Sequence, residues 1–419
     1  MYLNTWGMRL NYSTIGEYIR LVNIKNEDGE VDLLLGVNLN KKFMPSVANI
    51  VGTDLTKYKI IKKGQFGCKL MSVGRDKKLP ISLLTEHNEA IISTAYFVFE
   101  IIDETELLPD YLMMWFRRAE SDRYLWFQSG GDIRGRITWD DLCSLPIKVP
   151  SIEKQREIVK EYNTVVNRIK LNETLNQKLE ETAQALYKHW FVDFEFPNKD
   201  GKPYKSSGGK LVFNEELDKD IPEGWEAGNI GELVKNIGGG TPKTEIFDYW
   251  NNGDVNWFSP TDITKSSSIF CSTSNKKITE LGLNNSSAKL FPKHSVMMTS
   301  RATIGEIGIN TEVASTNQGF ITLIPNKMYP LYFLVEWLKT NLDEIDQLSS
   351  GSTFKEINKS DFRCLKIIKS TPLVSEIEKL LIPFYSQIET TSALSEKLVE
   401  FRSVLLSKMT MVEVEKEMA

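Results

Sequence analysis

Two segments of the chain carry apolar residues at the spacing of a long amphipathic helix. In residues 151–190, and again in residues 372–408, the apolar-leaning positions follow one another by steps of 4, 3, 4, 3, 3, 4, 3 and 4 residues. These steps are typical of a coiled coil, and the one short step is a stammer that overwinds a supercoil locally. The apolar positions of the predicted seam are Ile158, Tyr162, Val165, Ile169, Leu175, Leu179 and Leu186 in the first segment, and Ile377, Leu381, Phe384, Ile388, Leu394, Leu398, Phe401 and Leu405 in the second.

The two helical segments are predicted to pair with each other as an antiparallel coiled coil. The seam also contains Asn172 and Thr182 in the first series and Thr391 in the second, and polar residues at such positions lower stability but fix the register. Pro383 is expected to kink the second helix near its start. The alternative is that each helix packs only on its own neighbouring domain. We favour the pairing because a seam of this length has no evident partner in the chain except the other copy.

The residues that precede each helical segment have a different pattern, in which short β-rich runs alternate with turns and one helix. This pattern predicts a mixed α/β domain in each half of the chain. In the first half we expect strands at Tyr58–Ile61 and within Ala90–Ile102 and a helix at Leu108–Arg118. In the second half we expect a turn at Gly238–Pro242, strands at Ser295–Met298 and Gly319–Ile324, and a helix at Tyr329–Asn341.

The two halves also repeat in sequence at a constant offset of 220 residues. The matched pairs are Gly131/Gly351, Ile137/Ile357, Asp141/Asp361, Leu145/Leu365 and Ile147/Ile367. A weaker echo near the start of each half matches Ile15-Gly16-Glu17 with Ile230-Gly231-Glu232. Solenoid repeats span only about 20–50 residues, so a repeat of this length indicates two whole domains.

The sequence therefore predicts an α+β fold, with two similar mixed α/β domains at opposite ends of an antiparallel two-helix coiled coil, arranged with pseudo-twofold symmetry. The expected boundaries are a first domain at 1–150, a first helical region at 151–195, a linker at 196–220, a second domain at 221–370, a second helical region at 371–410 and a tail at 411–419.

Composition narrows the class of protein. The 419 residues are 41% hydrophobic and 26% charged, as in an ordinary soluble protein. The chain contains no apolar stretch of 18 residues and does not begin with a signal-like segment, so we expect a cytoplasmic protein. The four cysteines are scattered without CxxC spacing, which argues against a disulfide framework or a zinc site. The three histidines lie far apart, which argues against a metal site or hydrolase site built from histidine.

The net charge of −5 argues mildly against a nucleic-acid partner, but the local charge does not. Residues 41–78 contain ten Lys or Arg against two Asp, and residues 265–301 contain six against one Glu. Such runs are commonly just solvated faces. Because the two runs fall at similar places in the two halves, we interpret them as two surfaces that contact phosphates.

No catalytic motif is recognisable in the chain. The sequence contains no P-loop, no GxGxxG after a strand, no (Asn/Asp)-Pro-Pro-aromatic motif of amino-methyltransferases, no GxSxG and no HExxH. We therefore expect neither catalytic residues nor metal ligands in this chain.

The remaining polar and basic motifs are typical of a protein that recognises a ligand rather than of one that catalyses a reaction. Arg134 and Arg136 lie in a glycine-rich loop, with Lys355 at the equivalent place in the second half; the alternative is that Gly131 and Gly351 simply cap the preceding helices, and both interpretations can hold. Other side chains with guanidinium, amide and hydroxyl groups follow predicted strands. Such groups can read bases, because Arg can pair with guanine and Asn or Gln with adenine. The alternative is that these segments are ordinary polar loops. The candidate DNA-binding residues are Lys62, Lys63, Arg75, Arg134, Arg136, Thr241, Lys243, Lys276, Lys277, Arg301, Asn317, Gln318 and Lys355.

With these features together, the chain resembles the specificity (S) subunit of type I restriction-modification systems over nearly its whole length. The resemblance rests on the order of several motifs and on the repeat. The motifs are Leu35–Phe43, Gly64–Gly67, Val73–Asp76, Ala185–Pro197, Ile221–Trp225, Gly239–Pro242, Ser300–Gly305 and Ser315–Gly319.

The resemblance implies a non-catalytic subunit that reads a split DNA site, with one half-site for each target-recognition domain and the helix pair acting as a ruler. It also implies partners, namely two methyltransferase (M) subunits that use S-adenosylmethionine to methylate adenine, and endonuclease/translocase (R) subunits that use ATP and Mg. The rival hypotheses are a self-contained nuclease or methyltransferase with a divergent site, and a two-headed scaffold for protein partners.

Overall fold

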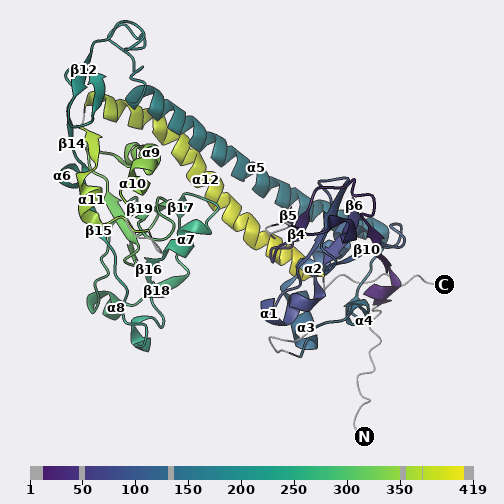
Figure 1. Ribbon diagram of the computed structural model, residues 1–419. Coiled ribbons are helices and arrows are strands. Elements are labelled where there is room, and N and C mark those ends of the chain that lie inside the picture. Colours follow the sequence, from purple (N-terminus) through teal and green to yellow (C-terminus); the bar gives the residue numbers. More distant parts are fainter. Residues whose placement is uncertain (1–12, 47–51, 131–135, 350–354, 370, 410–419) are drawn as a thin grey trace. The chain divides into compact units, whose positions relative to one another are not determined.

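The computed structural model describes residues 13–46, 52–130, 136–349, 355–369 and 371–409 (Figure 1). The chain forms two compact units. Unit 1 contains the residues up to Arg168 together with those from Lys397 onward, and unit 2 contains Ile169–Glu396. The two long helices, α5 (Ile152–Phe191) and α12 (Pro372–Lys408), each contribute residues to both units, and α12 continues through Pro383.

Unit 1 is built on a four-stranded antiparallel sheet with the strand order β2-β10-β7-β8 and a three-stranded sheet with the order β3-β6-β9. Phe66 and Phe99 stack at the centre of the core, with 4.8 Å between their ring centroids. The strands are β1 (Ser13–Thr14), β2 (Ile19–Val22), β3 (Ile24–Lys25), β4 (Leu35–Val37), β5 (Phe43–Pro45), β6 (Lys59–Lys62), β7 (Phe66–Cys68), β8 (Ile81–Leu83), β9 (Glu89–Ile92), β10 (Phe97–Ile101) and β11 (Pro146–Ile147). The helices are α1 (Val73–Asp76), α2 (Pro109–Arg117), α3 (Ala119–Gln128) and α4 (Trp139–Cys143), with 3-10 turns η1 (Ile15–Glu17), η2 (Leu55–Lys57) and η3 (Leu70–Ser72).

Unit 2 repeats this plan with a five-stranded sheet in the order β15-β22-β19-β20-β17 and a three-stranded sheet in the order β18-β16-β21. Its strands are β12 (Leu211–Asn214), β13 (Lys219–Pro222), β14 (Ala227–Asn229), β15 (Lys235–Gly238), β16 (Val255–Phe258), β17 (Phe270–Cys271), β18 (Lys276–Ile278), β19 (Val296–Thr299), β20 (Ile307–Asn310), β21 (Ala314–Thr316), β22 (Phe320–Ile324) and β23 (Lys366–Ile368). Its helices are α6 (Ile230–Leu233), α7 (Pro260–Thr264), α8 (Glu280–Asn284), α9 (Leu331–Thr340), α10 (Leu342–Gln347) and α11 (Lys359–Cys364), with the 3-10 turn η4 (Phe247–Tyr249).

The sequence repeat corresponds to one structural motif that occurs in both units. In unit 1 the Ile15 N–H donates to the Leu145 carbonyl at 2.9 Å, and in unit 2 the Ile230 N–H donates to the Leu365 carbonyl at the same distance. Thr138 caps α4 by accepting from the Asp141 N–H, and Asn358 caps α11 by accepting from the Asp361 N–H. All these positions lie in the repeated segments, so the prediction of two similar mixed α/β domains is confirmed.

The glycine that the two echoes share allows close packing in both units. A Cβ atom built on Gly16 would lie 2.8 Å from Cys143 Cβ, and one built on Gly231 would lie 2.5 Å from Arg363 Cβ. We expect Gly16→Ala and Gly231→Ala each to lower the free energy of unfolding by about 1–3 kcal/mol, because the backbone must shift to relieve the overlap. Gly36→Ala is the control, since its Cβ would meet only Tyr96 Oη, at 3.7 Å. Urea denaturation of the three variants measures the effect, and equal stability of all three would contradict this explanation.

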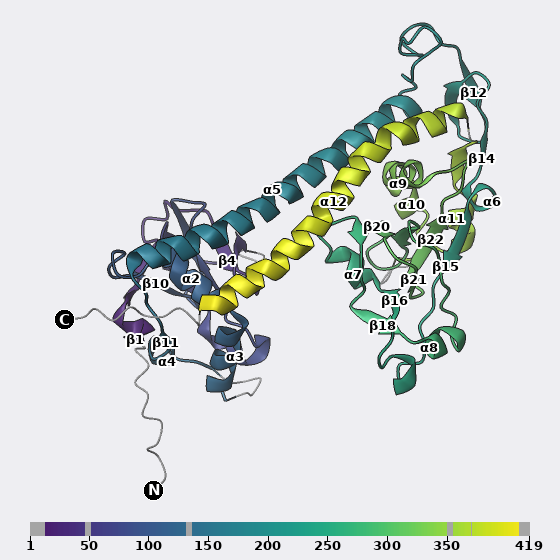
Figure 2. The same cartoon turned by 180° about the vertical axis from the view of Figure 1, so that it is seen from behind.

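Within unit 2, α5 and α12 run antiparallel and side by side (Figures 1 and 2). Asn172 Nδ2 donates to Ser395 Oγ at 3.0 Å, and Asn176 Nδ2 donates to Ser392 Oγ at 3.0 Å. A step forward on α5 is thus matched by a step backward on α12, as antiparallel pairing requires. The same part of α12 also packs on the second domain, since Ile377, Leu381 and Ile388 belong to one core with the α9 residues. Pairing and domain packing therefore both occur.

The predicted seam is wrong at four positions, one of which is Thr182, whose side chain is exposed. Leu175 is 40% exposed, Leu394 is 39% exposed and Phe401 is 48% exposed. The buried residue after Asn172 is Asn176, so the chain takes a step of four there and the short step does not occur. The other apolar seam positions are buried or partly buried: Ile158, Tyr162, Val165, Ile169, Leu179, Leu186, Ile377, Leu381, Phe384, Ile388, Leu398 and Leu405.

The expected linker at 196–220 is folded. Its residues form the antiparallel β12–β13 hairpin. Phe196 stacks on both Tyr204 and Trp225, at 4.7 and 5.2 Å between ring centroids. The polar composition of the segment does not indicate these aromatic contacts, which attach the segment to the second domain.

Among the described residues, every helix is too short or too polar to span a membrane.

Candidate nucleic-acid interface

A pocket of about 320 Å³ lies in unit 2 where the loop between β19 and β20 meets the loop between β21 and β22. The chain folds this way because β19 and β22 are neighbours in the sheet and the two loops leave the same edge. The pocket is lined by Pro260, Thr261, Thr264, Arg301, Ala302, Thr303, Asn317, Gln318 and Gly319.

Backbone hydrogen bonds hold Arg301 in its place in this pocket. The Ser300 N–H donates to the Gly319 carbonyl at 2.8 Å, and the Ala302 N–H donates to the Lys355 carbonyl at 3.0 Å. Ala302 has a φ of 60°, a left-handed conformation that costs a residue other than glycine about 1–3 kcal/mol. The surrounding bonds maintain this strained turn, so Arg301 is presented from a fixed backbone.

The pocket side chains also hydrogen-bond to one another and to nearby groups. Arg301 Nε lies 2.7 Å from Glu356 Oε1. The Gly319 N–H donates to Asn317 Oδ1 at 2.8 Å, and Thr241 Oγ1 donates to Gln318 Oε1 at 2.6 Å. The structure therefore brings together Thr241, Arg301, Asn317 and Gln318, four of the residues predicted from the sequence.

Lys355 joins the edge of the same site through its backbone. Its carbonyl accepts the Ala302 N–H, while its side chain forms an ion pair with Asp346, with 2.8 Å between Nζ and Oδ2. Glu356 and Asp346 were missed by the sequence reasoning. Their partners lie 55 and 9 residues away, and no local spacing rule identifies such pairs.

A second pocket of unit 2, about 380 Å³ in volume, is basic. It is lined by Thr244, Trp250, Asn275, Lys276 and Lys277, so its described lining contains no carboxylate. The Lys276 ammonium lies 5.7 Å from the Trp250 ring centroid, within the range of a cation–π contact. Trp250 Nε1 donates to the Lys243 carbonyl at 3.1 Å, which places Lys243 beside this pocket.

The aromatic residues near this pocket serve mainly as core. Trp257 is 7% exposed and Phe258 is 1% exposed. Trp250 is only half-buried and meets Trp257 edge to face at 5.0 Å between ring centroids. The tryptophan pair supports the strand β18 that carries Lys276 and Lys277.

The candidates of the first domain lie on three different elements. Lys62 ends β6 and Lys63 follows it, Arg75 lies on α1, and Arg136 precedes α4, all of them exposed. Arg75 forms an ion pair with Asp76 at 2.8 Å, and this hydrogen bond lowers the pKa of the Asp76 carboxyl. Arg134, like Gly131 and Gly351, lies outside the described residues.

One lysine of the first basic run is part of the core. Lys41 is 4% exposed, and its Nζ lies 2.8 Å from Asp122 Oδ1. Burial lowers the pKa of the Lys41 ammonium, although the Asp122 carboxylate opposes this shift. Lys41 therefore does not contribute to a phosphate-binding surface. The number of basic residues in residues 41–78 is thus larger than the number of exposed positive charges that they supply.

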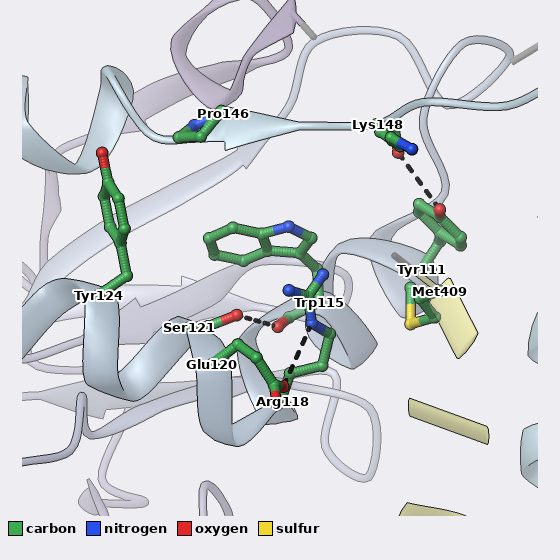
Figure 3. Close-up of a pocket in the computed structure, with 9 residues that line it drawn as sticks. All are labelled: Tyr111, Trp115, Arg118, Glu120, Ser121, Tyr124, Pro146, Lys148 and Met409. Carbon is green, nitrogen blue, oxygen red and sulfur yellow. Dashed lines mark hydrogen bonds and ion pairs between the residues drawn. The ribbon is translucent and has the colours of Figure 1, made fainter. Parts of the chain in front are cut away.

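A third pocket, of about 190 Å³, lies in unit 1 beside the end of α12 (Figure 3). Trp115, Tyr124 and Met409 supply its apolar lining, and Arg118 lies within 3.8 Å of Glu120. Tyr111 Oη donates to the Lys148 carbonyl at 3.2 Å across its edge. None of the predicted DNA-binding residues that the structure describes lines it. In the described part of the chain, no group of three His, Cys, Asp or Glu residues could hold a metal ion.

Comparison with known proteins gives a consistent picture. Residues 81–181 and 222–399 match the type I restriction modification DNA specificity domain. The chain is 24% identical to the type I restriction enzyme HindI specificity subunit of Haemophilus influenzae, over 88% of this chain and 91% of that protein. It is 27% identical to the MjaIX specificity subunit of Methanocaldococcus jannaschii, over 76% of this chain and 72% of that protein. Its fold is similar to the crystal structure of a type I restriction-modification S subunit from M. genitalium, with a TM-score of 0.55, 16% identity and coverage of 98% of each chain.

Proposed function

The chain belongs to the type I restriction modification DNA specificity family, and from this membership we propose that it reads a split DNA site, with one half-site for each of its two domains. The observation that carries the proposal is the repeat. The same motif, in which the backbone at Ile15 or Ile230 bonds to that at Leu145 or Leu365, recurs in units 1 and 2. Two similar domains in one chain suit a target that has two parts.

In unit 2 the two kinds of contact that sequence-specific binding needs lie on separate surfaces. Phosphate contacts position a protein on the duplex, and base contacts supply the sequence information. The basic pocket with Lys276 and Lys277 suits phosphates, and the pocket with Arg301, Asn317 and Gln318 suits base edges. We assign these roles to the second domain and, by the repeat, expect equivalent surfaces on the first.

The proposal extends to the partners and the cellular location. We infer that this subunit acts without chemistry of its own in the cytoplasm, beside methyltransferase subunits that bring S-adenosylmethionine and endonuclease subunits that bring ATP and Mg. The relatives support this, since each is called a specificity subunit of a type I restriction enzyme. The long helices α5 and α12 then set the spacing between the half-sites.

A turnover assay separates this proposal from its rivals. The purified chain, incubated with duplex DNA, S-adenosylmethionine and Mg²⁺, is expected to produce neither methylated nor cleaved DNA. Adding the methyltransferase subunits is expected to produce adenine methylation at a defined sequence. Turnover by the chain alone would instead support a self-contained enzyme, and failure to bind any duplex at low salt would support a protein scaffold.

Removal of two lysines of the basic pocket tests the phosphate assignment. We expect Lys276→Ala/Lys277→Ala to weaken binding by a similar factor on every sequence, and to reduce the slope of log K against log salt by up to roughly 1.8, at about 0.9 for each phosphate that is no longer neutralised. The control is Lys366→Ala/Lys369→Ala, because Glu216 and Glu226 already neutralise those lysines at 2.8 and 2.7 Å. Fluorescence anisotropy of labelled duplexes over a range of salt measures both slopes. A changed sequence preference in the first variant would contradict the assignment.

A further inference from the structure

The pocket around Arg301 offers hydrogen-bond donors. Asn317 Oδ1 accepts from the Gly319 backbone N–H, and Gln318 Oε1 accepts from Thr241 Oγ1. In the part of the chain that the structure describes, each amide thus has its oxygen engaged within the domain, and its NH₂ group is the part left for a ligand. Arg301 carries donors alone, and only its Nε is used by Glu356. The three side chains together therefore suit a ligand that presents acceptors.

The charge of the site distinguishes between the acceptors of DNA. Glu356 lies 2.7 Å from Arg301 Nε, and Asp346 lies 2.8 Å from Lys355 Nζ, so both cations at this site are already paired with carboxylates. A phosphate that approached Arg301 would meet the Glu356 carboxylate as well. The basic pocket, with Lys276 and Lys277 and no carboxylate in its described lining, is the better phosphate site.

Among the base edges in the major groove, guanine is the one with two acceptors and no donor. It presents N7 and O6, whereas adenine presents one acceptor and one donor, and cytosine presents a donor. Thymine has a single acceptor, O4, beside its methyl group. An arginine held from a fixed backbone, with Nε paired to Glu356, can direct its terminal NH₂ groups at N7 and O6 together.

We propose that the pocket formed by Arg301, Asn317 and Gln318 reads a guanine in the half-site of the second domain, with Arg301 as the principal contact. This inference rests on the proposed function and adds the class of base. It also favours guanine over the pairing of Asn317 or Gln318 with adenine, because one lone pair of each carbonyl oxygen is already used within the domain.

The test is methylation by the complex of this chain with its methyltransferase subunits, mapped by sequencing. The wild-type chain is compared with Arg301→Met, which keeps a long side chain but removes every donor, because lysine, like arginine, could still donate to guanine N7 and O6. We expect the variant's methylated motif to lose its requirement for one G·C pair in one block, while the other block stays unchanged. The unchanged block shows that the variant chain is folded and assembled.

A second measurement identifies the base atom. We replace that guanine by 7-deazaguanine, which lacks the N7 acceptor. Binding by the wild-type complex is expected to fall on the order of 10-fold, because the hydrogen bond to N7 is lost while the one to O6 remains. Binding by the Arg301→Met complex is expected to change much less, because methionine has no donor for N7 or O6.

Each other outcome overturns a specific assignment. An unchanged motif with equally weakened binding on all sequences makes Arg301 a phosphate contact and overturns the guanine assignment. If the variant loses its requirement for an A·T pair instead of a G·C pair, the guanine assignment is also overturned, while the split-site function stays intact. A wild-type complex that methylates no defined sequence overturns the proposed function and the guanine assignment together.

Discussion

Replacement of Asp122 by alanine is expected to lower the free energy of unfolding of unit 1 by about 3–5 kcal/mol, because it leaves the buried Lys41 ammonium without its counterion. Asp122 accepts from Lys41 at 2.8 and 2.9 Å and from the Leu79 backbone N–H at 3.1 Å. Lys41 also donates to the Phe116 carbonyl. This cluster joins the loop at Lys41 to helices α2 and α3, so the substitution should loosen all three segments.

Hydrogen exchange and urea denaturation of the variant measure this effect. Exchange should rise in unit 1 and stay unchanged in unit 2. The control is Asp76→Ala, which removes the ion pair with Arg75, whose side chain is exposed, and should cost at most about 1 kcal/mol. Equal stability of the two variants would mean that the Lys41–Asp122 pair contributes no more than a surface pair.

The second large effect is expected at Gln155, on the first turns of α5. Gln155 is fully buried, and its Oε1 accepts from the Leu108 N–H at 2.9 Å. Its Nε2 donates to the carbonyls of Glu106 and Pro150 at 2.7 and 2.9 Å. Gln155→Ala should therefore cost about 3 kcal/mol, at about 1 kcal/mol for each hydrogen bond removed.

Gln155 is a positioning residue that attaches the long helix to the first domain. Its counterpart in unit 2 is Glu378 on α12, whose carboxylate accepts from the Phe333 N–H at 2.9 Å at the start of α9. The control for Gln155→Ala is Glu153→Ala, two residues earlier on α5, where the side chain is 76% exposed. Hydrogen exchange at the start of α2 measures the difference. If the two variants exchange alike, Gln155 does not hold that helix.

The fold was predictable from the sequence because most of its determinants are local. The repeated Ile137/Ile357, Leu145/Leu365 and Ile147/Ile367 pairs are all buried, as repeated apolar residues in a common core should be. The strands and helices came from runs of apolar residues whose period matches the observed elements. The predicted helices at Leu108–Arg118 and Tyr329–Asn341 correspond to α2 and α9.

The seam residues of the helix pair were less predictable, because each of them contacts residues that are distant in the sequence. Hydrophobicity predicts Leu175 as the seam residue. In the structure Asn176 is buried instead, because Thr391 and Ser392 of α12 form hydrogen bonds with it. A buried polar residue is stable only where its partner lies opposite. That partner is more than 200 residues away, so one helix alone gives no sign of it.

The candidate site shows the same division between local and distant determinants. Arg301, Asn317 and Gln318 were found because each follows a strand, and the sheet brings those strand ends together. The carboxylate of Glu356, which orients Arg301, and that of Asp122, which pairs with the buried Lys41, were not found. Both are long-range pairs that depend on the completed fold.

Sequencing of the methylated adenines made by this chain with its methyltransferase subunits tests the proposed split-site function most directly. We expect one split motif, with two specified blocks separated by a nonspecific spacer of fixed length, and no methylation at that motif when this chain is omitted. A contiguous motif, two blocks that are methylated independently of each other, or the same motif without this chain would contradict it.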